Sequence, residues 1–251
     1  MLWDALGMSQ PGVVACVGAG GKTSLIQSLA VWAGKRCWPV LVTATTKMFY
    51  SQVDGYELVV ADEYAIGTEL VANALQSGKT TAWFAKRSGE KVLGVPQEWI
   101  DNMTAIIPKA YVLVEADGAR RSLLKAPAEH EPLIPSCTAT TVGILNISAI
   151  GQPLSETNTH RLSLVSNIIN KQAGETIAWQ DIALLAAHEQ GIFQYARGTK
   201  VLLLSGGGAP SAMIAAEQIA GFSKLVGLGV ARVVVTQGYG SVMAPIAVYE
   251  L

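Results

Sequence analysis

The chain has 251 residues, of which 50% are hydrophobic and 15% charged, and its formal net charge is -1. This length and hydrophobic content are sufficient to bury a full core, either in one large domain or in one domain plus a small subdomain. The near-balanced charge excludes the strongly basic surface typical of nucleic-acid-binding proteins. No stretch of about 18 uninterrupted apolar residues occurs, which argues against a membrane-spanning helix.

The N-terminal residues and the cysteines indicate a cytoplasmic protein. Met1–Asp4 lacks the basic and apolar segments that begin a secretory signal. Cys16, Cys37 and Cys137 lie far apart and form no C-x-x-C pair. Such sparse cysteines are expected to be reduced thiols, most simply small buried side chains.

Strands alternate with helices along the chain. In chain order we expect strand 13–17, helix 22–33, strand 39–44, helix 68–76, strands 80–84 and 91–95, helix 96–106, strands 111–115 and 140–146, helices 161–171 and 179–189, strand 201–204, helix 211–226, and strands 232–235 and 247–249. This alternation predicts an α/β fold of three αβα layers with a mostly parallel sheet, similar to P-loop NTPases. We treat residues 1–251 as a single domain, in which the helix-rich residues 160–198 form either a subdomain or an insertion.

A glycine-rich segment joins the first strand to the first helix. Its glycines let backbone N–H groups converge on an oxyanion, and the N-terminus of the following helix adds further donors. In the order Gly-Lys-Thr, the lysine reaches the β- and γ-phosphates and the threonine hydroxyl binds Mg²⁺. We therefore predict that ATP or GTP with Mg²⁺ binds at Gly18, Ala19, Gly20, Gly21, Lys22, Thr23 and Ser24.

The match to the full pattern G-x-x-x-x-G-K-[ST] is incomplete, because Cys16 stands in place of the first glycine. The remaining G-x-x-G-K-T resembles the loop of Mur-type ligases. One alternative is a tight turn that binds no ligand. Another is a dinucleotide fingerprint, but Thr23 occupies its third glycine position and no acidic residue follows the second strand.

Two carboxylates, Glu115 and Asp117, follow the buried strand 111–115. Ligands of open α/β sheets bind at this edge, where a carboxylate can hold Mg²⁺ or orient a nucleophile. We predict a metal site formed by Thr23, Glu115 and Asp117, with Lys22 and Asp117 also catalytic. The alternative is a local turn in which Asp117 bonds backbone ahead of Gly118.

Other polar residues are weaker candidates. Arg120 could offset charge on a transferring phosphoryl group, or it could be solvated or pair with Asp117. His130, between two glutamates, could be a proton shuttle or belong to a rigid surface loop. Thr45, in the cluster Thr43–Lys47 at a strand end, could contact the γ-phosphate or Mg²⁺, or be a β-branched strand residue.

The roles of two later segments remain open. Asn158 or Thr159 is the expected N-cap of the helix over 161–171, while His160 and Arg161 serve either this helix start or a substrate anion. The glycines Gly206–Gly208 occupy the place where many GTPases carry Asn-Lys-x-Asp, so guanine recognition is not indicated.

Residues 17–24, 42–48 and 114–135 together resemble the YqeC-like family, notably in Glu-Ala-Asp-Gly-Ala followed by Lys-Ala-Pro-Ala-Glu-His-Glu-Pro. The resemblance implies a cytoplasmic P-loop protein that assists maturation of a selenium-dependent molybdenum hydroxylase, whose apoprotein would be its partner. Three hypotheses follow: a maturation NTPase, a small-molecule kinase or ATP-dependent ligase, and a nucleotide-binding regulatory module without turnover.

Overall fold

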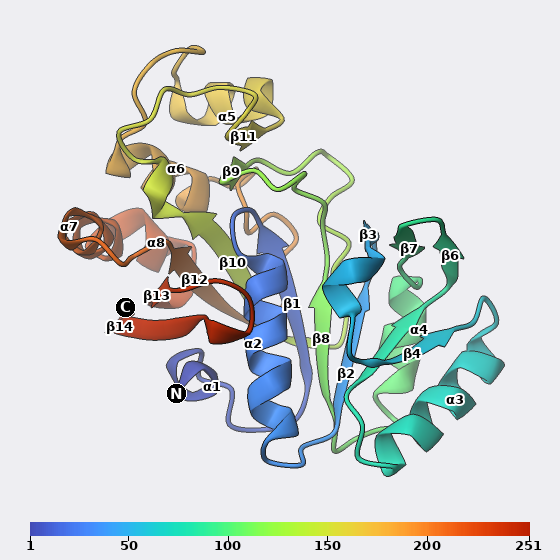
Figure 1. Ribbon diagram of the computed structural model, residues 1–251. Coiled ribbons are helices and arrows are strands. Elements are labelled where there is room, and N and C mark those ends of the chain that lie inside the picture. Colours follow the sequence, from blue (N-terminus) through green and yellow to red (C-terminus); the bar gives the residue numbers. More distant parts are fainter.

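The computed structural model describes residues 1–251. A nine-stranded sheet lies at its centre, in the order β14-β13-β12-β10-β1-β8-β2-β5-β4 (Figure 1). Its strands are β1 (Val13–Gly18), β2 (Val40–Ala44), β4 (Glu57–Val60), β5 (Thr81–Phe84), β8 (Tyr111–Glu115), β10 (Thr138–Asn146), β12 (Thr199–Ser205), β13 (Val230–Gln237) and β14 (Ala244–Glu250). Neighbours are parallel except β13 and β14.

The helices are α1 (Leu2–Ala5), α2 (Lys22–Gly34), α3 (Tyr64–Gln76), α4 (Gln97–Met103), α5 (Leu162–Ile169), α6 (Trp179–Ala187), α7 (Pro210–Ala220) and α8 (Ser223–Gly227). Short 3-10 turns cover Tyr50–Val53, Ile147–Ala149 and Gly240–Val242. None of these helices combines the length and the apolar character that crossing a bilayer requires.

Helices cover both faces of the sheet, which confirms the three-layer α/β fold. Alternate residues of β1 face opposite sides, as the pleat of a strand dictates. Val14 and Cys16 share a core with Leu25 of α2, whereas Val13, Ala15 and Val17 pack in the core that holds α3 and α4. Because every residue of β1 is buried, the strand is a continuous apolar run rather than an alternating one.

The segment 160–198 contains α5 and α6. Val165 and Ile182 of these helices belong to the same hydrophobic cluster as Leu202 and Val233 of the central sheet. Helix α6 therefore contacts β10 beside α7 and α8, helix α5 packs against α6, and the segment has no hydrophobic core of its own.

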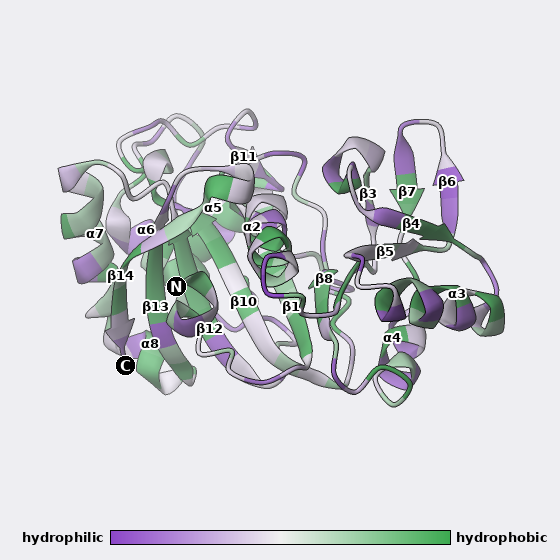
Figure 2. Cartoon of the chain, turned by 60° about the horizontal axis from the view of Figure 1, so that its bottom comes forward, coloured by the Kyte–Doolittle hydropathy of each residue, from purple (hydrophilic) through white to green (hydrophobic).

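A second, small sheet stands at the carboxyl edge of the central sheet. It consists of β3 (Lys47–Phe49), β7 (Lys91–Leu93) and β6 (Lys86–Ser88), all antiparallel. Figure 2 shows β6 as strongly hydrophilic, whereas the central strands are mainly hydrophobic. The strand expected at 91–95 thus belongs to this sheet, and a two-stranded pair, β9 (Leu124–Lys125) and β11 (Thr159–His160), lies near α5.

Two expectations about helices are wrong, and one strand was missed. The helix expected over 211–226 is two helices, because the chain leaves helical geometry at Phe222. The helix α5 begins only at Leu162, and the Asn158 side chain contacts Ser155 N and Pro153 O instead of capping it. The strand β4 was not expected, since its four residues include the exposed Glu57 and Val60 and give a weak apolar signal.

A substitution at Gly67, inside α3, tests the packing between this helix and the sheet. Alanine is the better helix former by roughly 0.5–1 kcal/mol, but a Cβ at Gly67 would lie 2.3 Å from the Trp83 ring. We expect Gly67→Ala to destabilise the protein by about 1–3 kcal/mol, because overpacking exceeds the propensity gain. Gly34→Ala, whose Cβ meets only Thr80 Oγ1 at 3.6 Å, is the control. Equal urea midpoints for the two variants would contradict this view of the core.

Candidate functional site

Residues 18–24, called here the phosphate loop, connect β1 to α2. Gly18 and Gly20 have φ values of 92° and 79°, in the left-handed region. A Cβ at Gly18 would lie 2.2 Å from Ile144 O, and one at Gly20 would lie 2.5 Å from Asn146 Cβ. Both positions therefore require glycine for conformation and for space.

Five consecutive amides of the loop donate no hydrogen bond within the protein. They belong to Gly20, Gly21, Lys22, Thr23 and Ser24, and the first donor of the regular helical pattern is Leu25 N, bonded to Gly21 O. The N-cap of α2, Gly21, offers no side chain to satisfy them. Free amides at the N-terminus of a helix form an anion site, because their dipoles add to that of the helix.

The orientation of the loop is fixed from neighbouring strands. Gly20 O accepts hydrogen bonds from Asn146 Nδ2 at 3.2 Å and from Ser205 Oγ at 2.6 Å. Asn146 and Ser205 end β10 and β12 and are paired in register. Since C=O and N–H of a trans peptide point in opposite directions, this anchoring turns the Gly21 N–H away from the two strands.

Beneath the loop, Asp117 holds two lysines and one loop amide. Its Oδ2 accepts from Gly18 N at 3.0 Å and lies 2.7 Å from Lys125 Nζ, and its Oδ1 lies 3.0 Å from Lys22 Nζ. Lys22 Nζ also donates to Gly18 O at 2.6 Å. Burial alone would lower the pKa of Lys22, but the carboxylates of Asp117 and Glu115 outweigh burial and raise it. Lys22 is therefore a charged ammonium under the loop.

The ion pairs continue beyond Asp117. Lys125 Nζ lies 2.9 Å from Glu131 Oε2. Arg161 donates to both oxygens of Glu131, from Nη1 to Oε2 at 2.6 Å and from Nη2 to Oε1 at 2.8 Å. Burial opposes ionisation of Glu131, but the hydrogen bonds from Arg161 and Lys125 lower its pKa to about 2. Opposite charges thus alternate from Lys22 to Arg161, in a row we call the charge chain.

On the other side of the loop, Thr23 faces the acidic end of β8. Thr23 Oγ1 donates to Glu115 Oε2 at 3.1 Å and accepts from Gln52 Nε2 at 2.9 Å. Burial raises the pKa of Glu115, although Lys22 and the Thr23 hydroxyl act in the opposite direction. A hydroxyl and a carboxylate therefore meet beside the free amides.

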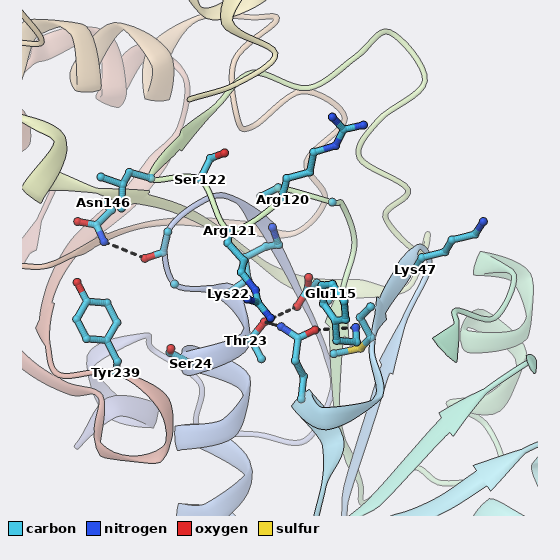
Figure 3. Close-up of a pocket in the computed structure, with 18 of the residues that line it drawn as sticks. Lys22, Thr23, Ser24, Lys47, Glu115, Arg120, Arg121, Ser122, Asn146 and Tyr239 are labelled. Atoms are coloured by element: carbon cyan, nitrogen blue, oxygen red, sulfur yellow. Dashed lines mark hydrogen bonds between the residues drawn. The ribbon is translucent and has the colours of Figure 1, made fainter. Parts of the chain in front are cut away.

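A cavity of about 440 Å³ opens over the loop, and Figure 3 shows the residues that line it. Its charged lining consists of five cations and one carboxylate: Lys22, Lys47, Lys91, Arg120, Arg121 and Glu115. The cavity is therefore positive although the whole chain has a net charge of -1. Such a surface attracts polyanions.

The structure brings most of the predicted residues together. Gly20, Gly21, Lys22, Thr23, Ser24, Glu115 and Arg120 line the cavity. Gly18 and Ala19 lie below it, because their amides donate to Asp117 and to Ile144 O. Asp117 is 1% exposed and lies outside the lining, and it pairs with Lys22 and Lys125 rather than with Arg120.

Two predicted residues lie elsewhere. Thr45 Oγ1 donates to Leu133 O and does not line the cavity. His130 is exposed on its loop and is also absent from the lining. Neither side chain makes a hydrogen bond or an ion pair with the phosphate loop.

Sequence reasoning missed Asn146, Ser205, Lys125, Gln52 and Tyr239. Asn146 and Ser205 end parallel strands at the ligand edge, so a check of every strand end would have found them. Lys125 is fully buried and ion-paired, which its surroundings in sequence do not indicate. Gln52 and Tyr239 come from a 3-10 turn and a loop that only tertiary packing places here.

The fold and this edge define an α/β protein with a glycine-rich loop, rich in free amides, at the carboxyl end of its mostly parallel sheet. Residues 14–163 match the family model described as YqeC protein. The chain is also 32% identical over 191 residues to the YqeC protein of Escherichia coli (strain K12). The aligned region covers 76% of this chain and 73% of the Escherichia coli protein.

The chain therefore belongs to the YqeC family, as the motifs predicted. No solved structure matches it.

Glu131 gives a prediction for acid stability. Its pKa falls from the ordinary 4.5 to about 2 on folding, so its stabilisation is complete above pH 4.5 and is lost as the pH falls toward 2. One pKa unit corresponds to about 1.4 kcal/mol, and screening at this partly open site reduces the total to about 2 kcal/mol. We expect Glu131→Gln to cost that amount at pH 7 and less at pH 3, measured by urea unfolding.

Glu129→Gln is the matched control, because Glu129 is exposed and makes no ion pair. A stability difference between wild type and Glu131→Gln that stayed constant from pH 7 to pH 3 would show that the pairs are not the cause.

Proposed function

We propose that this protein binds a nucleoside triphosphate with Mg²⁺ and hydrolyses it or transfers its γ-phosphoryl group. The observation that carries the proposal is the set of five unpartnered amides, Gly20–Ser24, that line a positive cavity at the N-terminus of α2. A triphosphate offers the dense negative charge and the acceptor oxygens that these donors require.

The donor set beside the loop suits Mg²⁺. This ion prefers oxygen ligands and commonly takes only one or two from protein, the rest coming from phosphates and water. Thr23 Oγ1 and Glu115 Oε2, 3.1 Å apart, are such a pair. No group of three or more His, Cys, Asp or Glu side chains could hold a metal by itself, which agrees with a site completed by nucleotide.

Thr23 and Glu115 would hold the ion, which, when bound, neutralises charge on the phosphates. In this assignment Asp117 acts as a positioning residue, because its carboxylate contacts Gly18 N, Lys22 and Lys125 rather than the cavity. Lys22 stabilises phosphate charge after leaving Gly18 O.

The nucleotide has a preferred direction in the cavity. Its γ-phosphate lies toward Thr23 and Glu115, and Figure 3 shows Tyr239 on the opposite side, past Ser24. Tyr239 lines the cavity and is 58% exposed, so its ring is free to stack on a base. Stacking tolerates adenine and guanine alike, and ATP and GTP both remain candidate ligands.

The cellular role follows from the family resemblance. We propose that turnover assists maturation of a selenium-dependent molybdenum hydroxylase in the cytoplasm, with the apoprotein as partner. Hydrolysis stimulated by that apoprotein would support this role, and turnover that requires a small acceptor would favour a kinase or ligase. Binding without any turnover would indicate a regulatory module.

Calorimetry of ATP and of GTP with Mg²⁺ tests the site. We expect Lys22→Ala to weaken binding about 10–100-fold, since a hydrogen bond to a charged group contributes about 1.5–3 kcal/mol. Lys35→Ala, at the exposed far end of α2, should bind as wild type does. If Lys22→Ala binds both nucleotides as tightly as wild type, the site assignment is wrong.

Lys22→Ala also removes one of the two lysines that pair with Asp117, so it changes more than the contact with phosphate. Thr23→Val, in which the new side chain has a similar shape, therefore provides a second test. It should lose the Mg²⁺-dependent part of nucleotide affinity and match wild type in excess chelator. An unchanged response to Mg²⁺ would remove Thr23 from the metal site.

Tyr239 is tested with ATP and with inorganic tripolyphosphate, which lacks a base. We expect Tyr239→Ala to lose about 1–3 kcal/mol of ATP affinity, the usual contribution of base stacking on an aromatic ring. Tyr239→Phe should retain it, and tripolyphosphate should bind all three proteins equally. A parallel loss for ATP and tripolyphosphate would mean that Tyr239 shapes the loop instead of contacting the base.

A further inference from the structure

A second cavity, of about 1000 Å³, lies between the Gly118–Ser122 segment and the start of α5. It shares Gly118, Arg120 and Ser122 with the cavity over the phosphate loop. Leu162 is the one hydrophobic residue in its lining, and the others are polar, charged or glycine. A lining of this kind is unsuited to an apolar ligand and suits a hydrated or anionic one.

Several hydrogen-bond donors around this second cavity have no partner. Ser122 is 5% exposed, and its hydroxyl makes no hydrogen bond although it lines the cavity. The Arg120 guanidinium makes no ion pair, and Figure 3 shows Arg120 and Ser122 pointing away from Lys22 and Thr23. The Ser122 side chain is thus largely enclosed, and its hydroxyl is free to hydrogen-bond a ligand in the cavity.

The start of α5 adds backbone donors. The amides of Leu162 and Ser163 donate no hydrogen bond, and Arg161 at the N-cap does not cap the helix with its side chain. Arg161 holds a left-handed conformation there, with φ of 59°. The positive end of the helix is therefore open to the cavity beside Ser122 and Arg120.

One cation in the lining is available to an oxyanion. The charged side chains of the lining are Arg120, Arg161 and Glu156. Arg161 is engaged by Glu131, whereas Arg120 makes no ion pair and is the cation free to bind a ligand. Burial and the charges of Arg161, Lys125 and Arg120 lower the pKa of His160 to about 4, so its imidazole is neutral at pH 7 and offers both a donor and an acceptor.

We propose that this cavity is a second ligand site, which binds a small polar molecule through a carboxylate or phosphate group held by Arg120, Ser122 and the first amides of α5. The oxyanion site itself does not depend on nucleotide binding. If the proposed function holds, a molecule bound here lies next to the nucleotide across Arg120 and Ser122, and it is the acceptor or effector of turnover.

The charge chain gives this second cavity a physical connection to the phosphate loop. Arg161 lines the cavity, and Glu131, Lys125 and Asp117 link it in turn to Lys22. The two cavities are thus connected by contacts as well as by shared walls.

The imidazole signals of His160 in NMR spectra report on this cavity directly. We would titrate the full-length protein at pH 7, without nucleotide, with inorganic phosphate in one arm and malonate in the other. Chloride at matched ionic strength corrects for screening. We expect saturable shifts of the His160 signals with phosphate, with malonate or with both. The His130 signals should change little, because His130 lies outside the cavity.

Ser163→Asp is the decisive variant. It places a carboxylate at the exposed start of α5, where a negative charge stabilises the helix but repels an anion. Its apparent affinity for the probe should fall at least about tenfold, or roughly 1.4 kcal/mol. Asn167→Asp makes a similar change on the same helix but faces a different groove, and it should titrate as wild type does.

The proposal is overturned if His160 responds to phosphate and malonate only as it does to chloride. It is equally overturned if Ser163→Asp and Asn167→Asp titrate alike, since the anion would then bind elsewhere, for example at the phosphate loop. Because no nucleotide is present, failure of this experiment leaves the nucleotide site untouched. Failure of the calorimetry likewise leaves the oxyanion site standing.

Discussion

The buried carboxylate of Asp117 is the interaction on which the rest of the site depends. An ionised group at 1% exposure is costly unless its surroundings replace water. Lys22 and the Gly18 amide do so from the phosphate loop, and Lys125 does so from β9. Removing any one of them leaves the others partly unpaired in a low-dielectric interior, so the segments are held in one arrangement.

The loop above Asp117 is pre-organised by what surrounds it. Asp117 fixes the amide of Gly18, Ile144 fixes that of Ala19, and Asn146 with Ser205 fixes the carbonyl of Gly20. The donors that remain free are therefore already oriented before any ligand arrives. Pre-organised donors bind an anion at lower entropic cost than a flexible loop would.

The same anchoring explains why two cavities adjoin. The chain leaves β8 toward Asp117, turns through Arg120 and Arg121 in left-handed conformations, and returns to pair with β11 near α5. One short segment thus forms a wall of both cavities. Non-glycine residues in the left-handed region store strain that the surrounding contacts must hold, and such strain is concentrated at functional sites.

The sequence by itself determined the parallel α/β fold, the strand–loop–helix placement of Gly18–Ser24 and the acidic end of β8, because these depend on local periodicity and on glycine chemistry. It could not place Asp117 under the loop, orient Thr45 toward Leu133, or find Lys125 and Tyr239. Those positions depend on which strands become neighbours and on how connecting loops cross the sheet edge. Only the tertiary structure decides this, since it alone brings together charges that are far apart in sequence.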